Sequence, residues 1–164
     1  MDYDGQFRFA EPPAVVWSTI ERLDEFEKWW GWLGSFGVQG AGLRKGAVLE
    51  GLVAPPLPYR MAVRVRLTRC QPQRLVDAEV TGDLAGEAHL RLRPEGGGTL
   101  TDVAWSLEML QRPMRMVALA AYPLLRWGHD RVVDVTVRSF RSQLEQLEQL
   151  EQVQSPRLER RCTA

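Results

Sequence analysis

The sequence predicts an α+β protein in which a curved antiparallel sheet of about six or seven strands surrounds one long C-terminal helix. Segments that alternate apolar and polar residues follow one another between residues 5 and 109, which is typical of half-buried strands. The stretch from Arg112 to about Leu150 instead carries apolar residues at helical spacing, so one face of that helix must be buried. The sheet is the only partner large enough to bury it.

Length and composition are those of one globular domain. The chain has 164 residues, 45% hydrophobic and 26% charged, and these values argue against wholesale disorder. We expect the domain to span residues 1–150, and residues 151–164 to form a polar, disordered tail. Lys plus Arg and Asp plus Glu number 21 each, so the net charge is zero and a nucleic-acid partner is not expected.

The sequence carries no signal for a metal site or a membrane segment. Cys70 and Cys162 are too far apart for a cysteine cluster, and the cysteines and histidines lack metal-ligand spacing. The longest apolar run, MVALAAYPLL, is too short to span a bilayer and contains Pro123. The first residues, MDYDGQFRF, do not resemble a signal peptide. We therefore expect a cytoplasmic, soluble protein with no metal, no cofactor and no integral membrane segment.

The N-terminal part is predicted to form one strand and two short helices. Residues 5–10 alternate between apolar and polar side chains, as a half-buried strand does. Pro12 and Pro13 end that strand and suit the first turn of a helix, which we predict for residues 14–23. A second short helix is predicted from Glu25 to about Trp32.

Large apolar residues gather in and just after this second helix, at Phe26, Trp29, Trp30 and Leu33. Two interpretations are open for them. They form either a plug of the hydrophobic core or a wall or lid of a ligand cavity. The second interpretation makes Trp30 a candidate ligand-binding residue.

Alternating segments after residue 46 predict the rest of the sheet. The glycine-rich residues 34–46 are expected to form a loop, with at most a short strand around Val38. The predicted strands cover residues 47–53, 60–68, 74–81, 87–93 and 99–109. Their clearest inward-facing residues are Met61, Val63, Val65, Leu67, Val76, Ala78, Val80, Ala88, Leu90, Leu92, Val103, Trp105, Leu107 and Met109. Hairpin spacing predicts an antiparallel meander, with arginines and acidic residues opposed on its outer face.

The long C-terminal helix is predicted to begin at Pro113 and to be kinked at Pro123. Its buried stripe is expected to hold Tyr122, Leu125, His129, Val133, Val137, Phe140, Leu144 and Leu147. After Leu144 the sequence repeats every three residues, so its leucines drift away from the stripe and leave the core. This part is either a solvated helix end or a partner contact, such as a homodimer through the C-terminal helix.

One titratable residue falls on the buried stripe. His129 could reach the interior and act as a general acid or base near neutral pH, or it could be a structural, hydrogen-bonded histidine. Asp130 projects about 100° away and so cannot orient that imidazole. Arg126 could bind a carboxylate or enolate oxygen, or it could extend its guanidinium group into solvent.

Apolar residues of the inner face are candidate ligand contacts. Tyr59 follows a proline-rich turn and could sit at the rim of a cavity. The inner residues that form either plain core or pocket lining are Met61, Val63, Trp105, Leu107 and Met109. Trp30 and Tyr122 complete the set. Motifs of P-loop, dinucleotide-binding, zinc-peptidase and serine-hydrolase sites are absent, which argues against those enzyme classes.

The order of strand, two short helices, several strands and one long helix resembles the START/Bet v 1-like (SRPBCC) helix-grip superfamily. Within that superfamily it is most similar to the polyketide cyclase/dehydrase-like group. The segments that carry the resemblance are PPAVVWSTI, FEKWWGWL, PPLPYRMAVRVRL and WGHDRVVD, and it covers about Phe7 to Leu147. It implies a cavity between the sheet and the last helix for a lipid, a polyketide or another aromatic or apolar compound.

Members of this superfamily include carriers, cyclases, dehydratases and lipid-transfer modules, so the fold leaves several functions open. Our first hypothesis is a module that binds a hydrophobic small molecule. The second is a polyketide cyclase or dehydratase, with His129 as acid/base and Arg126 or Tyr59 stabilising negative charge. The third is a protein contact through the Leu-Gln-Glu repeat after Leu144.

Overall fold

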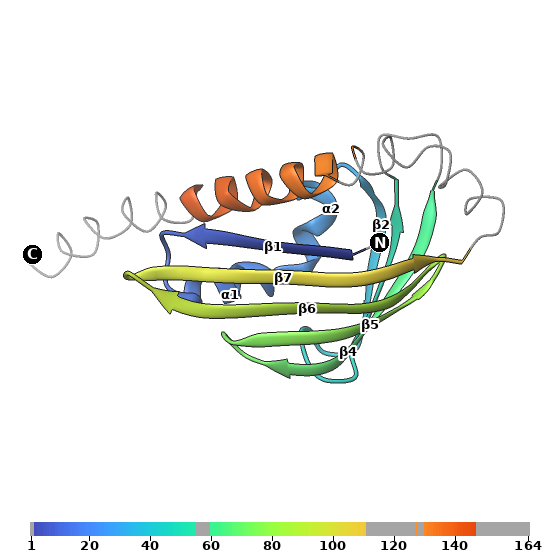
Figure 1. The fold of residues 1–164 in the computed structure, drawn as a ribbon, viewed down its shortest axis with the longest axis horizontal. Coiled ribbons are helices and arrows are strands. Elements are labelled where there is room, and N and C mark those ends of the chain that lie inside the picture. Colours follow the sequence, from blue (N-terminus) through green and yellow to red (C-terminus); the bar gives the residue numbers. More distant parts are fainter. Residues whose placement is uncertain (1, 55–59, 111–126, 128–129, 147–164) are drawn as a thin grey trace, which may run out of the picture.

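The computed structural model describes residues 2–54, 60–110, 127 and 130–146. Within them, seven strands form one antiparallel sheet in the order β1-β7-β6-β5-β4-β3-β2 (Figure 1). The strands are β1 (Asp2–Phe9), β2 (Leu33–Gln39), β3 (Val48–Val53), β4 (Met61–Gln71), β5 (Leu75–Gly82), β6 (Leu84–Glu95) and β7 (Gly98–Met109). The helices are α1 (Pro13–Ile20), a 3-10 turn η1 (Leu23–Glu25), α2 (Phe26–Trp29) and a C-terminal helix over residues 130–146. This is the α+β helix-grip fold that the sequence predicts.

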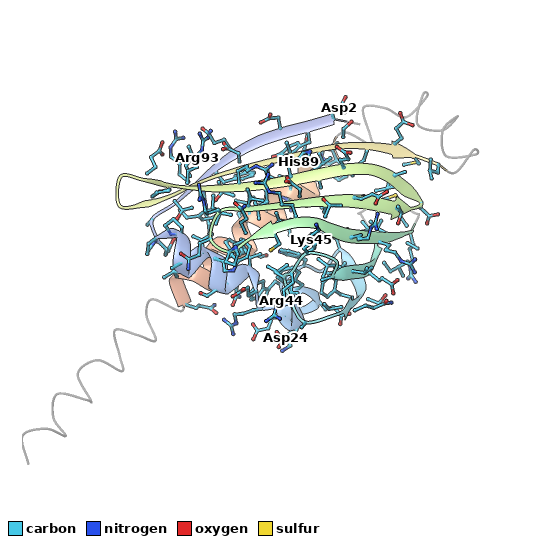
Figure 2. The ribbon with its side chains drawn as sticks, turned by 90° about the horizontal axis from the view of Figure 1, so that it is seen from below. Asp2, Asp24, Arg44, Lys45, His89 and Arg93 are labelled. Atoms are coloured by element: carbon cyan, nitrogen blue, oxygen red, sulfur yellow. The ribbon has the colours of Figure 1, made fainter. Side chains whose placement is uncertain are left out.

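The sheet is a meander closed by one long-range pairing. Strands β2 to β7 pair consecutively, whereas β1 pairs with β7. β1 and β2 are therefore the two edges of the sheet, and α1, η1 and α2 connect one edge to the other. The sheet curves, and the C-terminal helix lies along its concave side (Figure 1). The convex side carries charged side chains such as Arg93 and faces away from that helix (Figure 2).

The strand register confirms the predicted inner and outer faces. Val65 of β4 lies opposite Val80 of β5, and Leu90 of β6 lies opposite Val103 of β7. Opposite charges meet on the outer face in the pairs Arg64–Glu50, Arg66–Glu79, Arg91–Asp77 and Arg93–Asp102. Their arginines are well exposed, so each pair stabilises the fold by no more than about 1 kcal/mol.

Most predicted boundaries differ from the structure by a few residues, and three differences concern the edges of the sheet and the aromatic segment. Residues 34–39, predicted as part of a loop with at most a short strand around Val38, belong to β2 and pair with β3. The glycines of β2 hide the alternation that marks the other strands, so the pairing partner and not the local pattern defines it. The second helix ends at Trp29 and not near Trp32, because Trp30 is already extended, with φ −119° and ψ 95°. β1 begins at Asp2, ahead of the predicted start.

Of the four stripe residues that the structure describes, Phe140 and Leu144 are buried, whereas Val133 and Val137 are half-buried. Phe140 is 8% exposed and Leu144 only 1%. The helix start predicted at Pro113, the kink at Pro123 and the tail over residues 151–164 lie outside the described residues.

One end of the concave face is filled by side chains, and we call it the packed end. Its sheet residues are Phe9 and Leu92, and Val16 and Trp17 of α1 belong to the same cluster. The cluster continues across the sheet to Ala78 and Leu67, which lie in the cross-strand row of Trp105. Phe140 makes edge-to-face contacts with Phe9 and Trp29, at ring-centroid distances of 5.4 and 6.5 Å. Leu144 joins the cluster one helical turn further on. The packed end therefore contains the main hydrophobic core of the described residues.

Candidate functional site

The opposite end of the concave face is apolar but less filled, and we call it the open end. Its side chains are Met61, Val63, Trp105, Leu107 and Met109, the five inner residues that the sequence gives as core or pocket lining. None of the five belongs to the core cluster of the described residues. Met61 is buried and the other four are only half-buried. Solvent thus reaches apolar side chains inside the curve of the sheet, as is typical of small-molecule sites.

Two glycines leave the floor of the open end without side chains. Gly82 lies opposite Val63, and Gly86 lies opposite Leu107. Their φ angles are +113° and +152°, a region that residues with a side chain rarely adopt. A Cβ atom on Gly86 would lie 1.9 Å from the carbonyl oxygen of Ser106. Neither position accepts a side chain, so the floor between β4 and β7 stays bare.

Tyr3, which is not among the predicted site residues, belongs to the open end. Its ring stacks on Trp105 at a centroid distance of 4.3 Å. The ring also covers Gly5, where an added Cβ would lie 2.2 Å from the Tyr3 hydroxyl oxygen. Burial, and then the charges of Asp130 and Asp4, raise the pKa of Tyr3. The phenol is therefore neutral at physiological pH and keeps a proton to donate.

Trp30 stands between two aromatic neighbours at the border of the packed end. Its ring lies 4.3 Å from that of Phe26 and stacks on Trp32 at 5.5 Å, with only 9° between the planes. Trp32 Nε1 donates a hydrogen bond of 3.0 Å to Thr136 Oγ1, which ties this wall to the C-terminal helix. The wall interpretation of the aromatic segment therefore requires Trp32, which the sequence analysis did not single out.

Three buried polar atoms of the described residues have no hydrogen-bond partner among them. These atoms are Trp17 Nε1, Trp30 Nε1 and Thr101 Oγ1. A buried donor left unpaired costs about 1–3 kcal/mol. Trp17 and Thr101 belong to the packed end, so Trp30 Nε1, at its border, is the one of the three that is a candidate contact for a polar atom of a bound molecule.

A groove of about 360 Å³ runs between β1 and the C-terminal helix. Its apolar surface comes from Tyr3, Phe7, Val133 and Val137, and its charged rim from Asp130, Asp134, Arg138 and Arg141. Tyr3 contacts both this groove and Trp105, so the groove adjoins the open end. Two of the rim residues, Asp134 and Arg138, form an ion pair with each other.

Four predicted site residues, Tyr59, Tyr122, Arg126 and His129, lie outside the described part of the chain. The other six divide between the open end and the aromatic wall that contains Trp30. In the described ranges, no group of three or more His, Cys, Asp or Glu side chains could hold a metal ion. A search of the same ranges finds no helix long and apolar enough to cross a membrane.

The sequence matches a protein-family model described as "Polyketide cyclase / dehydrase and lipid transport" over residues 3–150. The chain belongs to this family. The match covers both ends of the concave face and the whole sheet. No curated protein matches the sequence significantly.

Solved structures with the same fold agree with this family and confirm the resemblance to the START/Bet v 1-like superfamily. A protein from Thermus thermophilus has a TM-score of 0.72 at 11% identity, over 90% of this chain and 99% of that chain. A START superfamily protein from Mycobacterium smegmatis has a TM-score of 0.66 at 13% identity, over 89% and 98%. The di-domain ARO/CYC StfQ of the steffimycin biosynthetic pathway has a TM-score of 0.69 at 10% identity, over 90% and 52%. At these identities the likeness concerns the fold.

Proposed function

We propose that the chain binds a hydrophobic small molecule, of lipid, polyketide or aromatic type, against the open end of its sheet. One observation carries the proposal: four inward apolar residues, Val63, Trp105, Leu107 and Met109, stay half-exposed inside the curve of the sheet. Covering such surface is favourable by about 25 cal/mol per Å². A bound apolar molecule supplies that cover.

The open end offers shape and aromatic surface to this ligand. Trp105 provides a flat ring and Met109 an adaptable thioether, which together suit a planar or flexible apolar molecule. At Gly82 and Gly86 no side chain rises from the sheet, because a Cβ atom there would meet the carbonyl oxygen of the neighbouring strand. Tyr3 adds a second aromatic ring, stacked on that of Trp105. The favoured ligand is therefore apolar, with a planar part that can lie against these rings.

The first test is native mass spectrometry with organic extraction of the purified protein, followed by titration with an apolar fluorescent probe such as Nile red. Leu107→Gln places a polar amide on the inner face and should weaken probe binding at least about tenfold. Glu108→Gln places the same amide on the neighbouring, outward-facing position and should leave binding unchanged. Equal binding by both variants would reject the open end as the site.

A second candidate function is a cyclase or dehydratase reaction on a polyketide-like ketone. The family description and the likeness to an ARO/CYC structure favour it. In this proposal His129 is the acid/base, and Arg126 or Tyr59 stabilises the developing negative charge. His129→Ala should abolish turnover while ligand affinity stays within a few fold. Unchanged turnover would remove His129 from that role.

Two further parts of the proposal come from the sequence alone. The first is a cytoplasmic location, which cell fractionation tests. The second is a homodimer through the C-terminal helix, with the Leu-Gln-Glu repeat after Leu144 as the contact. Truncation after Leu144 should then abolish association in sedimentation experiments, and an unchanged dimer would exclude the repeat.

A further inference from the structure

The two edges of the sheet differ in how they are protected from further pairing. At β2 the register shifts between Leu33 and Ser35, and the backbone N–H of Phe36 donates to the carboxylate of Glu27. A bulge and a side chain bonded to the strand both hinder the addition of another strand. β1 pairs with β7 without a register shift from Asp2 to Phe9, and it contains no proline. Of the two edges, β1 is the regular one.

In a strand, the backbone N–H and C=O groups of successive residues point alternately to its two sides. This alternation shows which residues of β1 direct these groups to the outer side of the sheet. The N–H of Leu110, just after β7, donates to the carbonyl oxygen of Asp83, just before β6. Even-numbered residues of β7 therefore bond toward β6, and odd-numbered ones toward β1. In the register of β1 with β7, the odd residues of β1 bond to β7. The residues whose N–H and C=O groups face outward are thus Asp2, Asp4, Gln6 and Arg8.

The carbonyl oxygen of Arg8 agrees with this assignment. It accepts a long contact of 3.4 Å from the guanidinium group of Arg141 in the C-terminal helix, a contact that an added strand would replace. In an antiparallel strand the N–H and C=O of one residue point to the same side. The outer edge of β1 therefore offers the alternating donors and acceptors that an added strand requires.

The sequence of β1 is self-complementary about Gly5. In an antiparallel pairing of two copies centred there, Asp2 lies opposite the partner's Arg8, Asp4 opposite the partner's Gln6, and Tyr3 opposite the partner's Phe7. Each pairing joins residues of the same face, since the positions differ by an even number. The register also makes the outward-facing residues the hydrogen-bonded pairs. We propose that two copies of the chain associate through β1 with a two-fold axis at Gly5.

Charge and shape on both faces favour a second copy over an unrelated strand. On the outer face, Arg8 already pairs with Glu95 and Asp2 accepts a hydrogen bond from Ser106, but Asp2 is exposed and the Arg8 side chain is 67% exposed, so opposite charges from two copies can join these contacts. On the inner face, Tyr3 and Phe7 line the groove beside the C-terminal helix, where the partner's rings extend its apolar surface. At the axis Gly5 has no side chain, which suits the close approach, about 4.5 Å between Cα atoms, of a non-hydrogen-bonded pair. The contact is isologous, as a closed dimer requires.

Sedimentation velocity of the full chain over a range of concentrations tests the proposal, and a reversible dimer is the expected result. Gln6→Pro removes an outward N–H, and no hydrogen bond to β7, so it should weaken the dimer at least about tenfold. Gln6→Thr loses the same side chain but keeps that N–H, and it should dimerise within a few fold of the parent. Circular dichroism checks that both variants are folded.

Charge reversal tests the register. Asp2→Arg and Arg8→Asp should each weaken the dimer, because like charges then lie opposite one another, and the double variant should restore it. Arg64→Asp is the matched control, since Arg64 forms a similarly exposed cross-strand pair with Glu50 in the middle of the sheet. A chain that stays monomeric overturns the proposal. A dimer that persists in the Gln6→Pro variant also overturns it. If truncation after Leu144 abolishes such a dimer, the contact lies in the C-terminal helix.

Discussion

The packed end and the open end of the concave face are built from the same strands but differ in how completely they are buried. β7 shows the difference within a single element. Thr99 and Thr101, at the packed end, are 1% and 4% exposed, whereas Leu107 and Met109 are half-buried. Larger apolar residues are thus less buried than threonines on the same strand face. The change from filled core to half-buried surface therefore occurs within β7 and not between separate elements.

The cause lies in what covers each end. At the packed end, α1, Trp29 and the turn of the C-terminal helix with Phe140 and Leu144 fill the space above the sheet. At the open end, two glycines remove side chains from the floor, and the described neighbours are the ring of Tyr3 and the groove beside it. The comparison can be tested by making the same change at both ends.

Leu144→Ala at the packed end should have the largest effect. The leucine is 1% exposed and surrounded by core, so the substitution leaves a cavity and costs roughly 2–5 kcal/mol of unfolding free energy. Urea denaturation followed by tryptophan fluorescence measures it. A loss below about 1 kcal/mol would show that this end is not tightly packed.

Leu107→Ala makes the identical change at the open end, and its cost should be about 1 kcal/mol because the side chain is already half-exposed. Affinity for Nile red should fall in the same variant, whereas Leu144→Ala should retain affinity in whatever fraction remains folded. A loss of stability equal to that of Leu144→Ala would remove the distinction between the two ends.

Substitution of two tryptophans tests how the aromatic wall at the border between the two ends is stabilised. Trp32→Phe removes the N–H that bonds to Thr136 and should cost about 1 kcal/mol. Trp30→Phe removes an N–H that has no partner among the described residues, so it should cost less or even stabilise the fold. Thermal and urea unfolding show which of the two variants loses more free energy of unfolding. A larger loss in Trp30→Phe than in Trp32→Phe would contradict the hydrogen bond between Trp32 and Thr136.

The smallest effect is expected from charges on the convex face. Burial raises the pKa of Asp77, but hydrogen bonds and charges from His89 and Arg91 outweigh it, so the pKa lies below its ordinary value of 3.8. A lowered pKa contributes stability that is present above the unfolded value and is lost as pH falls through the folded value. Asp77→Asn should therefore flatten the pH dependence of stability below about pH 4. Probe binding at neutral pH should not change; if it does, the convex face influences the open end.

The sequence predicts the fold and both faces of the sheet because an alternation of period two is a local property. Met61 and Leu107 could be assigned to the inner face from their own neighbours in sequence. Only a short strand around Val38 was expected in place of β2, because Gly34 and Gly37 interrupt that pattern and the strand is ordered by its pairing with β3. Tyr3 was missed for a related reason, since its role depends on stacking with a residue far along the chain.

The candidate site is predicted less completely than the fold. Periodicity gives the side of the sheet on which a residue lies, but not how deeply its neighbours cover it. Leu92 of β6 and Leu107 of β7 are both assigned to the inner face by the same alternation, but Leu92 belongs to the core cluster and Leu107 does not. Only the positions of the helices over the sheet separate these two cases. The roles predicted for His129 and Arg126 remain predictions, since both lie outside the described residues.

The pairing of β1 with β7 also sets an order of assembly. The side chains of Ser106 and Asp2 form a hydrogen bond across 104 residues of sequence, whereas β2 to β7 join through successive hairpins. Closing a long loop costs more chain entropy than closing a short one, so local hairpins form first. During synthesis β1 leaves the ribosome before any other strand, yet it must wait until β7 has been made. We expect the docking of this first strand to be the last step of folding, and its rate to limit how quickly the finished sheet appears.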